Sequence, residues 1–484
     1  MVDWIKNNKI EFICLIFILA FATFFRFFKI NQTFYFIGDA GRDAQAAYKI
    51  IFDHKFTLIG PKTSIGGFYL GPFYFYLITI PLMFFNMNPL GLGYMVSFIG
   101  VMAVFLSFLV GRLLFNSKTG LVIAFLYATS SIIVSYSRMA WNPSPVPLFT
   151  LLLIILIYLY QKTKRSLCIW LLGFIFGLGV QLHYNFICLI PSVVVYLLLT
   201  NTKFKKTIRD LIGAGLLMMV THLPLVLFEI RHQFITSKAF LRFLKSGDIG
   251  MGLGDITNNF FRLIKQTVEL TIFSPRPMSF MFFIIYLLAM LTLLLIEKKR
   301  KEIGLLFTLF FLGAFCFSFF SGTLQLYYLN FLLPFPIILA GVFLGALLSK
   351  KIFVPLVIII LMVYWANNWI ANISPARPRP NLEEITTISK SIVERVPSGQ
   401  AFNIALFSGE LWHSAEEYRY FTYYFGERAL GPEDYRNIQK LFVISFGPME
   451  NPLSIRSQET DDFGPKKIED NWAVGSAGIF QLSR

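Results

Sequence analysis

The chain has 484 residues, of which 56% are hydrophobic and 14% are charged, and its formal net charge is +16. This composition excludes an ordinary soluble globular protein, because apolar runs long enough to cross about 30 Å of hydrocarbon recur along it. The excess Lys and Arg residues lie in short clusters between these runs, as in cytoplasmic loops of membrane proteins, so the charge does not indicate a nucleic-acid partner. The sequence predicts an α-helical protein that crosses a membrane many times.

The first apolar run covers residues 10–30 and ends in Arg26 and Lys29. No small-residue cleavage site follows it, so we expect a retained membrane helix and not a cleaved signal peptide. Lys6 and Lys9 precede the run and favour a cytoplasmic N-terminus.

The segment after this helix, residues 31–88, is predicted to lie outside the membrane and combines a polar stretch, Gly38–Ala44, with a Gly/Pro/aromatic stretch, Ser64–Tyr74. An acidic side chain beside the hydrocarbon boundary costs free energy, so Asp39 is a candidate functional residue. The ordinary alternative is that Asp39 is the N-cap of a helix over residues 40–51, a common position for Asp.

Two charged residues follow Asp39 closely. Asp43 would share a helical face with Asp39, and the two carboxylates could bind a divalent metal together, although a solvated surface carboxylate is the simpler alternative for Asp43. Arg42 could pair with either Asp or contact a phosphate group.

Ten further apolar runs predict membrane helices. They cover residues 90–110, 121–136, 146–160, 167–180, 186–199, 211–228, 278–296, 303–320, 327–348 and 352–370. Every basic cluster faces the cytoplasm only if residues 69–85 do not cross, so we expect an interfacial aromatic helix there. This gives about eleven transmembrane helices in the plasma or inner membrane, with the C-terminus outside the cytoplasm.

The chain changes character near residue 373, after which a proline-rich linker leads into a mixed pattern. Local signals predict a helix that starts at Asn381, followed by Glu384, strands over 402–407 and 441–446, a capping box of Ser414 and Glu417 before residues 418–425, and an edge strand over 472–482. We therefore expect a transmembrane catalytic domain over residues 1–372 and an extracytoplasmic α/β domain over residues 373–484. The latter shows no catalytic or metal motif and is predicted to cover the active site or bind a partner.

Five features, in this order and spacing, resemble bacterial glycosyltransferase family 39. They are Asp39 after the first span, the Arg42-Asp43 pair, the aromatic stretch to Tyr76, Gly111–Phe115 at an inner helix end, and Tyr136-Ser137-Arg138 at an outer one. That family includes protein O-mannosyltransferases and lipid A aminoarabinose transferases and has the GT-C membrane fold. The similarity is best over residues 10–200.

The resemblance implies inverting transfer of a sugar from a polyprenyl-phosphate donor to an acceptor on the outer face of the membrane, with Asp39 as the base. A single displacement needs one carboxylate for the acceptor proton and cations for the departing phosphate, with no nucleophilic carboxylate. The acceptor could be protein, lipid or glycan. The resemblance assigns no definite cofactor, and binding of a divalent metal by Asp39 and Asp43 stays an open alternative. Trp141-Asn142-Pro143 stands where some relatives place a second acidic residue.

Several outer-face residues are candidates for binding the donor phosphate or sugar. Arg138 suits a bidentate phosphate contact, and its alternative is an interfacial Arg whose charge reaches water. His183 could bind sugar or phosphate, or it could be a satisfied interfacial His. Arg231 and His232 open the long outer segment and could bind the phosphate.

Aromatic residues offer two further candidates. One pair, Tyr327 and Tyr328, could contact the donor or belong to the aromatic belt at the membrane surface. A second group could form the wall of a groove for the isoprenoid tail: Tyr69, Phe73, Tyr74 and Tyr76.

Two other functions remain as alternatives. A polysaccharide polymerase or oligosaccharide ligase would use the same carrier lipid and differ in its product. A lipid or glycan transporter should carry ionisable residues in mid-membrane or internal repeats, and this sequence has neither pattern.

Overall fold

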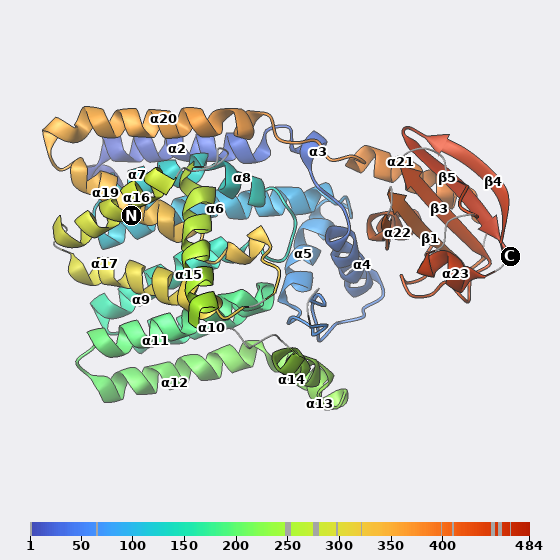
Figure 1. Ribbon diagram of the computed structural model, residues 1–484, viewed down its shortest axis with the longest axis horizontal. Coiled ribbons are helices and arrows are strands. Elements are labelled where there is room, and N and C mark those ends of the chain that lie inside the picture. The colour runs from blue at the N-terminus through green and yellow to red at the C-terminus, as the bar shows by residue number, and fades with distance from the viewer. Residues whose placement is uncertain are drawn as a thin grey trace. The chain divides into compact units, whose positions relative to one another are not determined.

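The computed structural model describes residues 2–63, 66–246, 253–273, 280–296, 299–320, 322–397, 399–408, 411–446, 451–453, 457–464 and 466–484. It confirms a mainly helical chain with a small sheet near the C-terminal end (Figure 1). The chain forms two compact units. The helical unit comprises Met1–Phe28, Thr57–Tyr74 and Tyr94–Pro375, and the mixed unit comprises Lys29–Phe56, Phe75–Gly93 and Ala376–Arg484. The predicted division at residue 372 did not foresee that two N-terminal segments would join the C-terminal domain.

Each predicted apolar run corresponds to helical structure. These helices lie wholly or mostly in the helical unit: α1 (Val2–Asn7), α2 (Lys9–Phe27), α6 (Leu90–Leu114), α7 (Ser117–Thr129), α8 (Ser131–Tyr136), α9 (Val146–Thr163), α10 (Ser166–Leu182), η1 (Tyr184–Cys188), α11 (Leu189–Thr200), α12 (Phe204–Thr221), α13 (Leu223–Arg231), α16 (Phe280–Ile296), α17 (Arg300–Phe307), η3 (Thr308–Leu312), α18 (Gly313–Phe317), η4 (Leu326–Leu329), α19 (Pro334–Leu347), η5 (Lys351–Phe353) and α20 (Val354–Ile373). Residues 278 and 279, at the start of one predicted span, lie outside the described part, as do Ser64 and Ile65.

By length and composition, four helices of the described chain can cross a membrane. They are α2, α6, α9 and the segment Lys351–Ile373, and the bent pair α12 and α13, with an angle of 58°, can count as a fifth. Shorter apolar helices accompany them, including α10 and α19. The predicted total of about eleven spans therefore stays a prediction.

The long outer segment predicted after residue 229 also contains helices. They are α14 (Ile235–Ser246), α15 (Leu253–Val268) and η2 (Glu269–Phe273). One stripe of α15 is buried, with Leu263, Ile264 and Val268 at 2% exposure or less. The 3.6-residue spacing of these apolar side chains explains the helix, because one face then packs on neighbouring helices.

Helices far apart in the sequence pack closely in the helical unit. Helices α2 and α20 lie side by side (Figure 1), and the rings of Phe25 and Trp369 are 5.6 Å apart. In α19, Gly341 and Gly345 form a small-residue stripe against α7, where a Cβ on Gly345 would lie 2.4 Å from Oγ1 of Thr119. Small residues at this spacing let two helix backbones approach, which is a common way to pack membrane helices.

The mixed unit combines helices of the first outer segment with the C-terminal sheet. Its elements are α3 (Ile30–Thr33), α4 (Asp39–Phe52), most of α5 (Phe73–Phe84), α21 (Leu382–Val393), β1 (Phe402–Ser408), β2 (Leu411–His413), α22 (Glu416–Tyr424), β3 (Lys440–Phe446), α23 (Gln458–Phe463), β4 (Lys467–Val474) and β5 (Ala477–Ser483). The strand order is β2-β1-β3-β5-β4, with β1 and β3 parallel and the other pairs antiparallel.

The local predictions for this domain have mixed outcomes. The predicted helix start at Asn381 is confirmed, and Asn381 and Glu384 form a capping box there. The strands now seen as β1 and β3 are also confirmed. The edge strand over residues 472–482 is wrong, because Gly475 adopts φ +61° in a turn that divides this segment into β4 and β5. The strand at the edge is β4, and β5 lies inside the sheet.

The capping box of Ser414 and Glu417 is also wrong. Helix α22 begins after Ala415, which adopts a left-handed conformation and makes no side-chain cap. Glu417 instead accepts a hydrogen bond from the backbone of Gly38.

Arg419 is the polar centre of the C-terminal domain. Its guanidinium is fully buried and donates to Oδ1 of Asn403, to the carbonyls of Ile404 and Leu430, and to the hydroxyl of Tyr435. These neutral acceptors tie α22 to β1 and to the segment before β3.

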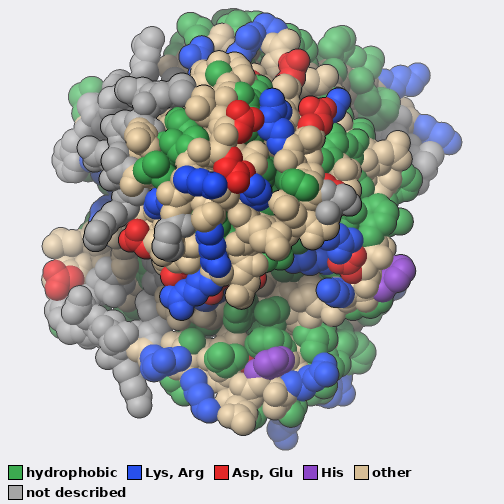
Figure 2. Space-filling model, turned by 90° about the vertical axis from the view of Figure 1, so that its right-hand side faces the viewer, with side chains coloured by type: hydrophobic (Ala, Val, Ile, Leu, Met, Phe, Trp, Pro, Cys, Tyr) green, Lys and Arg blue, Asp and Glu red, His purple; other side chains and the backbone are tan. Residues whose placement is uncertain are grey.

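The surface in Figure 2 carries Lys and Arg side chains interspersed with Asp and Glu. Ion pairs of the mixed unit include Arg436 with Asp462 and Lys440 with Glu469. This face therefore presents mixed charge.

We expect Gly41→Ala to separate α4 from α22. A Cβ at Gly41 would lie 2.4 Å from the backbone N of Glu417 and 2.6 Å from the carbonyl carbon of Glu416, and backbone atoms cannot move aside as a flexible side chain can. We expect a loss of about 2 kcal/mol in stability, measured by thermal unfolding in detergent. The control is Gly431→Ala, whose added Cβ would meet Oδ2 of Asp434 at 3.4 Å; equal effects of the two changes would contradict this packing.

Candidate active site

Asp39 is the first residue of α4, and the N-cap is Gly38 at φ +54° and ψ −106°. The alternative that Asp39 caps the helix is therefore not realised, since the capping position is one residue earlier and has no side chain. A carboxylate in the first helical turn is stabilised by the partial positive charge of the helix N-terminus. The side chain of Asp39 is 58% exposed, so its carboxylate is accessible to a ligand.

Arg42 links the two acidic residues of α4. Its Nε and Nη2 donate to Oδ1 of Asp43 at 2.9 and 2.7 Å, and its Nη1 donates to Oδ1 of Asp39 at 2.7 Å. The side chain of Asp43 is 1% exposed. The buried carboxylate thus fixes the guanidinium, which in turn contacts the exposed carboxylate of Asp39.

Asp43 differs electrostatically from an ordinary surface carboxylate. Burial raises its pKa to about 7, against the opposing effect of Arg42. Because the guanidinium lies between Asp43 and Asp39, a metal held by both carboxylates would have to displace it. The described residues contain no group of three or more His, Cys, Asp or Glu side chains that could hold a metal ion. The arrangement fits an ion-pair network better than the metal site that the sequence left open.

A cavity of about 520 Å³ lies beside Asp39. Its lining comes from the mixed unit: Gly38, Asp39, Arg42, Ser414, Glu416, Pro432, Glu433, Tyr435, Gln458 and Glu459. This volume is within the usual range of small-molecule sites, so a sugar residue fits it. The C-terminal domain supplies seven of these ten residues, which local sequence patterns did not indicate, because the partners are distant in the chain.

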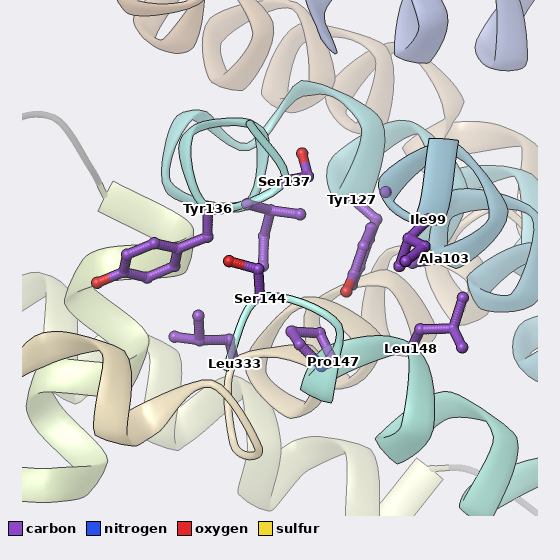
Figure 3. A pocket seen from close by; sticks show the side chains of 11 residues that line it. Ile99, Ala103, Tyr127, Tyr136, Ser137, Ser144, Pro147, Leu148 and Leu333 are labelled. Carbon is purple, nitrogen blue, oxygen red and sulfur yellow. The ribbon is translucent and has the colours of Figure 1, made fainter. Parts of the chain in front are cut away.

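A second, much smaller cavity lies in the helical unit (Figure 3). It measures about 20 Å³, and Tyr127, Ser137 and Ser144 supply hydroxyl groups near an otherwise mainly apolar lining. A space of this size holds about one water molecule, so it is too small for a sugar or an isoprenoid chain.

Arg138 is 6% exposed and caps the C-terminal end of α2. Its Nη1 donates to the carbonyls of Phe25 and Arg26 at 2.7 and 3.0 Å, and its Nη2 donates to the carbonyl of Phe28 at 3.0 Å. A cation at these terminal carbonyls also interacts favourably with the helix dipole. The residue is buried, so the alternative of an interfacial Arg that reaches water is wrong, while a phosphate contact stays a prediction.

Three other candidates meet in an aromatic cluster of the helical unit. The ring of His183 lies 5.9 Å from that of Tyr327 and 5.4 Å from that of Tyr328. Trp141, which the sequence analysis did not select, is 5.6 Å from Tyr327. Burial lowers the pKa of His183, in the turn after α10, to about 4, so its ring is neutral at pH 7. The cluster therefore offers rings and neutral hydrogen-bonding groups.

Arg231 and His232 lie at the end of α13 and are exposed. The ring of His232 stacks on Phe228 with centroids 4.1 Å apart. The neighbouring Glu229 is buried and accepts hydrogen bonds from the backbone N of Thr236 and Ser237 at the start of α14. Glu229 thus fixes the bend between α13 and α14, and the two exposed side chains remain candidates for an anionic ligand.

The predicted isoprenoid groove needs one correction. Tyr74 is fully buried, so its ring cannot line an open groove. The other three members, Tyr69, Phe73 and Tyr76, are partly exposed. In the helical unit, the carbonyl of Tyr69 accepts from the hydroxyl of Tyr184.

Comparison with solved structures places this architecture among known folds. A crystal structure of ArnT from Cupriavidus metallidurans bound to undecaprenyl phosphate matches with a TM-score of 0.67 over 96% of this chain and 97% of that chain, at 11% identity. The chain has a GT-C fold. The apo form of the same ArnT matches over the same shares of both chains, with a TM-score of 0.64 at 12% identity.

A second type of GT-C protein is also similar. The archaeal oligosaccharyltransferase AglB from Archaeoglobus fulgidus, in complex with an inhibitory peptide and a dolichol-phosphate, matches with a TM-score of 0.56 and 12% identity, covering 92% of this chain and 70% of that one. Residues 70–227 also match the family model described as dolichyl-phosphate-mannose-protein mannosyltransferase. No curated protein sequence matches. The predicted resemblance to glycosyltransferase family 39 with a GT-C fold is confirmed.

We expect Arg138→Gln to destabilise the protein even without a donor lipid. The change removes charge-assisted hydrogen bonds to the end of α2, at a cost of about 3 kcal/mol. Thermal unfolding of the ligand-free protein in detergent measures this loss. Arg165→Gln is the control, because Arg165 is exposed and makes no side-chain cap; a change in stability that appears only with donor lipid would instead favour a phosphate contact.

Proposed function

We propose that the protein is an inverting glycosyltransferase that moves a sugar from a polyprenyl-phosphate donor to an acceptor at the outer face of the cell membrane. The observation that carries this proposal is the exposed carboxylate of Asp39 beside Arg42, at a sugar-sized polar cavity, in a chain with a GT-C fold. The acceptor is a hydroxyl-bearing protein, lipid or glycan.

Asp39 is the general base in this reaction. The acceptor hydroxyl binds in the cavity within about 2.6 to 3.2 Å of the carboxylate. As the acceptor oxygen attacks the anomeric carbon, its proton passes to Asp39 and the bond from that carbon to the phosphate oxygen breaks. The polyprenyl phosphate leaves with the bonding electrons, and the single displacement inverts the anomeric centre.

Arg42 has two tasks in the proposed site. Its Nη1 donates a hydrogen bond to Oδ1 of Asp39 and so fixes the direction of that carboxylate. Its position next to the base also allows it to neutralise the departing phosphate, since guanidinium groups bind phosphate oxygens well.

The comparisons support a lipid-linked donor for the proposed reaction. The matched ArnT binds undecaprenyl phosphate and the matched AglB binds a dolichol-phosphate, which supports a lipid-linked donor for this chain. Candidate contacts to the donor phosphate or sugar are Arg138, His183, Arg231, His232, Tyr327 and Tyr328. The aromatic cluster around His183 suits the apolar face of a sugar ring.

We also propose the orientation of the chain. The basic clusters place the N-terminus in the cytoplasm and the domain of residues 373–484 outside it, in a multi-pass protein of the plasma or inner membrane. Residues 1–372 then carry the membrane part, and Asp39 meets its acceptor on the outer side.

An oligosaccharide ligase or polymerase is the second candidate, and the similarity to AglB favours it over a transporter. Both enzyme classes use a lipid carrier, so the size of the transferred glycan distinguishes them. Transfer of one sugar per donor supports the proposal made here, and transfer of a preassembled oligosaccharide supports the ligase.

We expect Asp39→Asn to slow transfer strongly, because the amide cannot accept the acceptor proton. The assay uses full-length protein in liposomes with undecaprenyl-phosphate monosaccharides radiolabelled in the sugar, and follows label passed to added envelope extract. A fall of about 10² to 10⁴ in kcat is expected. Asp434→Asn, an exposed position of the mixed unit outside the cavity lining, is the control. Equal turnover by wild type and Asp39→Asn would remove Asp39 as the base.

We expect the activity to fall as the pH drops through about 7. Asp43 has a pKa raised to about 7, so it is charged above this pH and neutral below it. On protonation it stops holding Arg42 as an ion pair, and the guanidinium no longer has a fixed position beside Asp39. Asp43→Asn should lower kcat at pH 8 and remove the acid limb of the pH–rate profile, which is the fall in kcat between about pH 8 and 6. An unchanged acid limb in that variant would assign the limb to another group.

A further inference from the structure

Helix α4, which carries Asp39, is held at its N-terminal end by the C-terminal domain. Oε2 of Glu417 accepts a hydrogen bond from the backbone N–H of Gly38 at 2.9 Å. Glu417 is 2% exposed. A carboxylate at the start of a helix is favoured by charge-assisted hydrogen bonding and by the helix dipole.

The opposite end of α4 is held by the opposite charge. Arg428 donates to both carboxylate oxygens of Asp53, the C-cap residue of α4, at 3.0 and 2.8 Å. Its guanidinium also lies 5.6 Å from the ring of Tyr48 and 5.4 Å from that of Tyr423. Hydrogen bonding by Arg428 lowers the pKa of Asp53, so this pair is charged at neutral pH.

Between these ends, one face of α4 lies directly on α22. Nε2 of Gln45 donates to the side chain and to the carbonyl of Glu416, at 2.8 and 2.9 Å, and Gly41 leaves no room for a side chain against Glu417. Gly38, Gly41 and Gln45 are three and four residues apart, so they share one helical face. Asp39 and Arg42 lie next to that face and line the cavity.

The contact at Gly38 matters most for Asp39, because the two residues are adjacent. Gly38 has φ +54°, and no atom lies within 4 Å of its Cβ position. Glycine visits many backbone conformations, and a fixed acceptor for its N–H selects one of them. The direction in which α4 starts, and with it the carboxylate of Asp39, then depends on Glu417.

We propose that the C-terminal domain positions the catalytic base, with Glu417 as the positioning residue at the start of α4 and Arg428 with Asp53 as the support at its end. This inference rests on the proposed function. It gives the domain of residues 376–484 a direct part in the reaction, besides supplying the far wall of the cavity.

The test compares Glu417→Ala, Glu417→Gln and a control, Glu394→Ala, in full-length protein. Glu394 is an exposed acidic residue of the same domain at the end of α21. The probe is the same set of radiolabelled undecaprenyl-phosphate monosaccharides in liposomes. Hydrogen exchange of the peptide covering residues 36–45 is followed in parallel, because it reports the Gly38 amide without any need for turnover.

We expect Glu417→Ala to lower kcat about 10- to 100-fold with little change in KM for the donor, since a small misplacement of a catalytic group has effects of this size. Exchange at Gly38 should become faster. Glu417→Gln keeps an oxygen acceptor and should recover most of the rate, and Glu394→Ala should match wild type in both measurements.

The outcomes distinguish the positioning role of Glu417 from the proposed function. A normal kcat in Glu417→Ala, or a loss of rate that only follows the loss of folded protein on thermal unfolding, would overturn the positioning role. If the wild-type protein turns over none of the donors, the proposed function is overturned, and so is the catalytic role of the hydrogen bond between Gly38 and Glu417. Unchanged exchange at Gly38 in an active Glu417→Ala would overturn the positioning role alone.

Discussion

In the proposed function, the base Asp39 must be exposed to its substrate and yet held rigidly, and helix α4 meets both demands. Its interaction with charged groups at its two ends is the constraint on which the site depends. Glu417 binds the end where helix dipoles leave partial positive charge, and Arg428 binds the end where they leave partial negative charge. Asp39 can therefore remain more than half exposed while its backbone is fixed.

Ion pairs within α4 also fix side chains of the site. Arg42 would be a flexible side chain on a surface, but the buried carboxylate of Asp43 holds it by two nitrogens. The third nitrogen then meets Asp39 in a defined direction. Burial of Asp43 raises its pKa and costs free energy. The pH sensitivity of the network therefore lies at this buried residue, next to the exposed pair of Asp39 and Arg42.

The sequence predicted most of the helices and several strands, because apolar runs and capping residues are local signals. The run of residues 211–228 predicted the helical structure of α12 and α13 but not the 58° bend between them. Local signals failed where the partner is distant. Glu417 looks like part of a capping box in its own segment, and the structure pairs it with Gly38, 379 residues away. Arg138 likewise caps a helix that ends more than 100 residues earlier, and its capping role has no local signature.

The distance between Gly38 and Glu417 along the chain has a consequence for synthesis. Helix α4 leaves the ribosome early, but its acceptor at Glu417 and its support at Arg428 are made several hundred residues later. Every translation product that stops before Glu417 therefore carries Asp39 without the contacts that we propose orient it. In the proposed mechanism, synthesis of the segment that carries Glu417 and Arg428 is then the step that turns a chain already inserted in the membrane into one able to react, so products that stop before this segment are inactive.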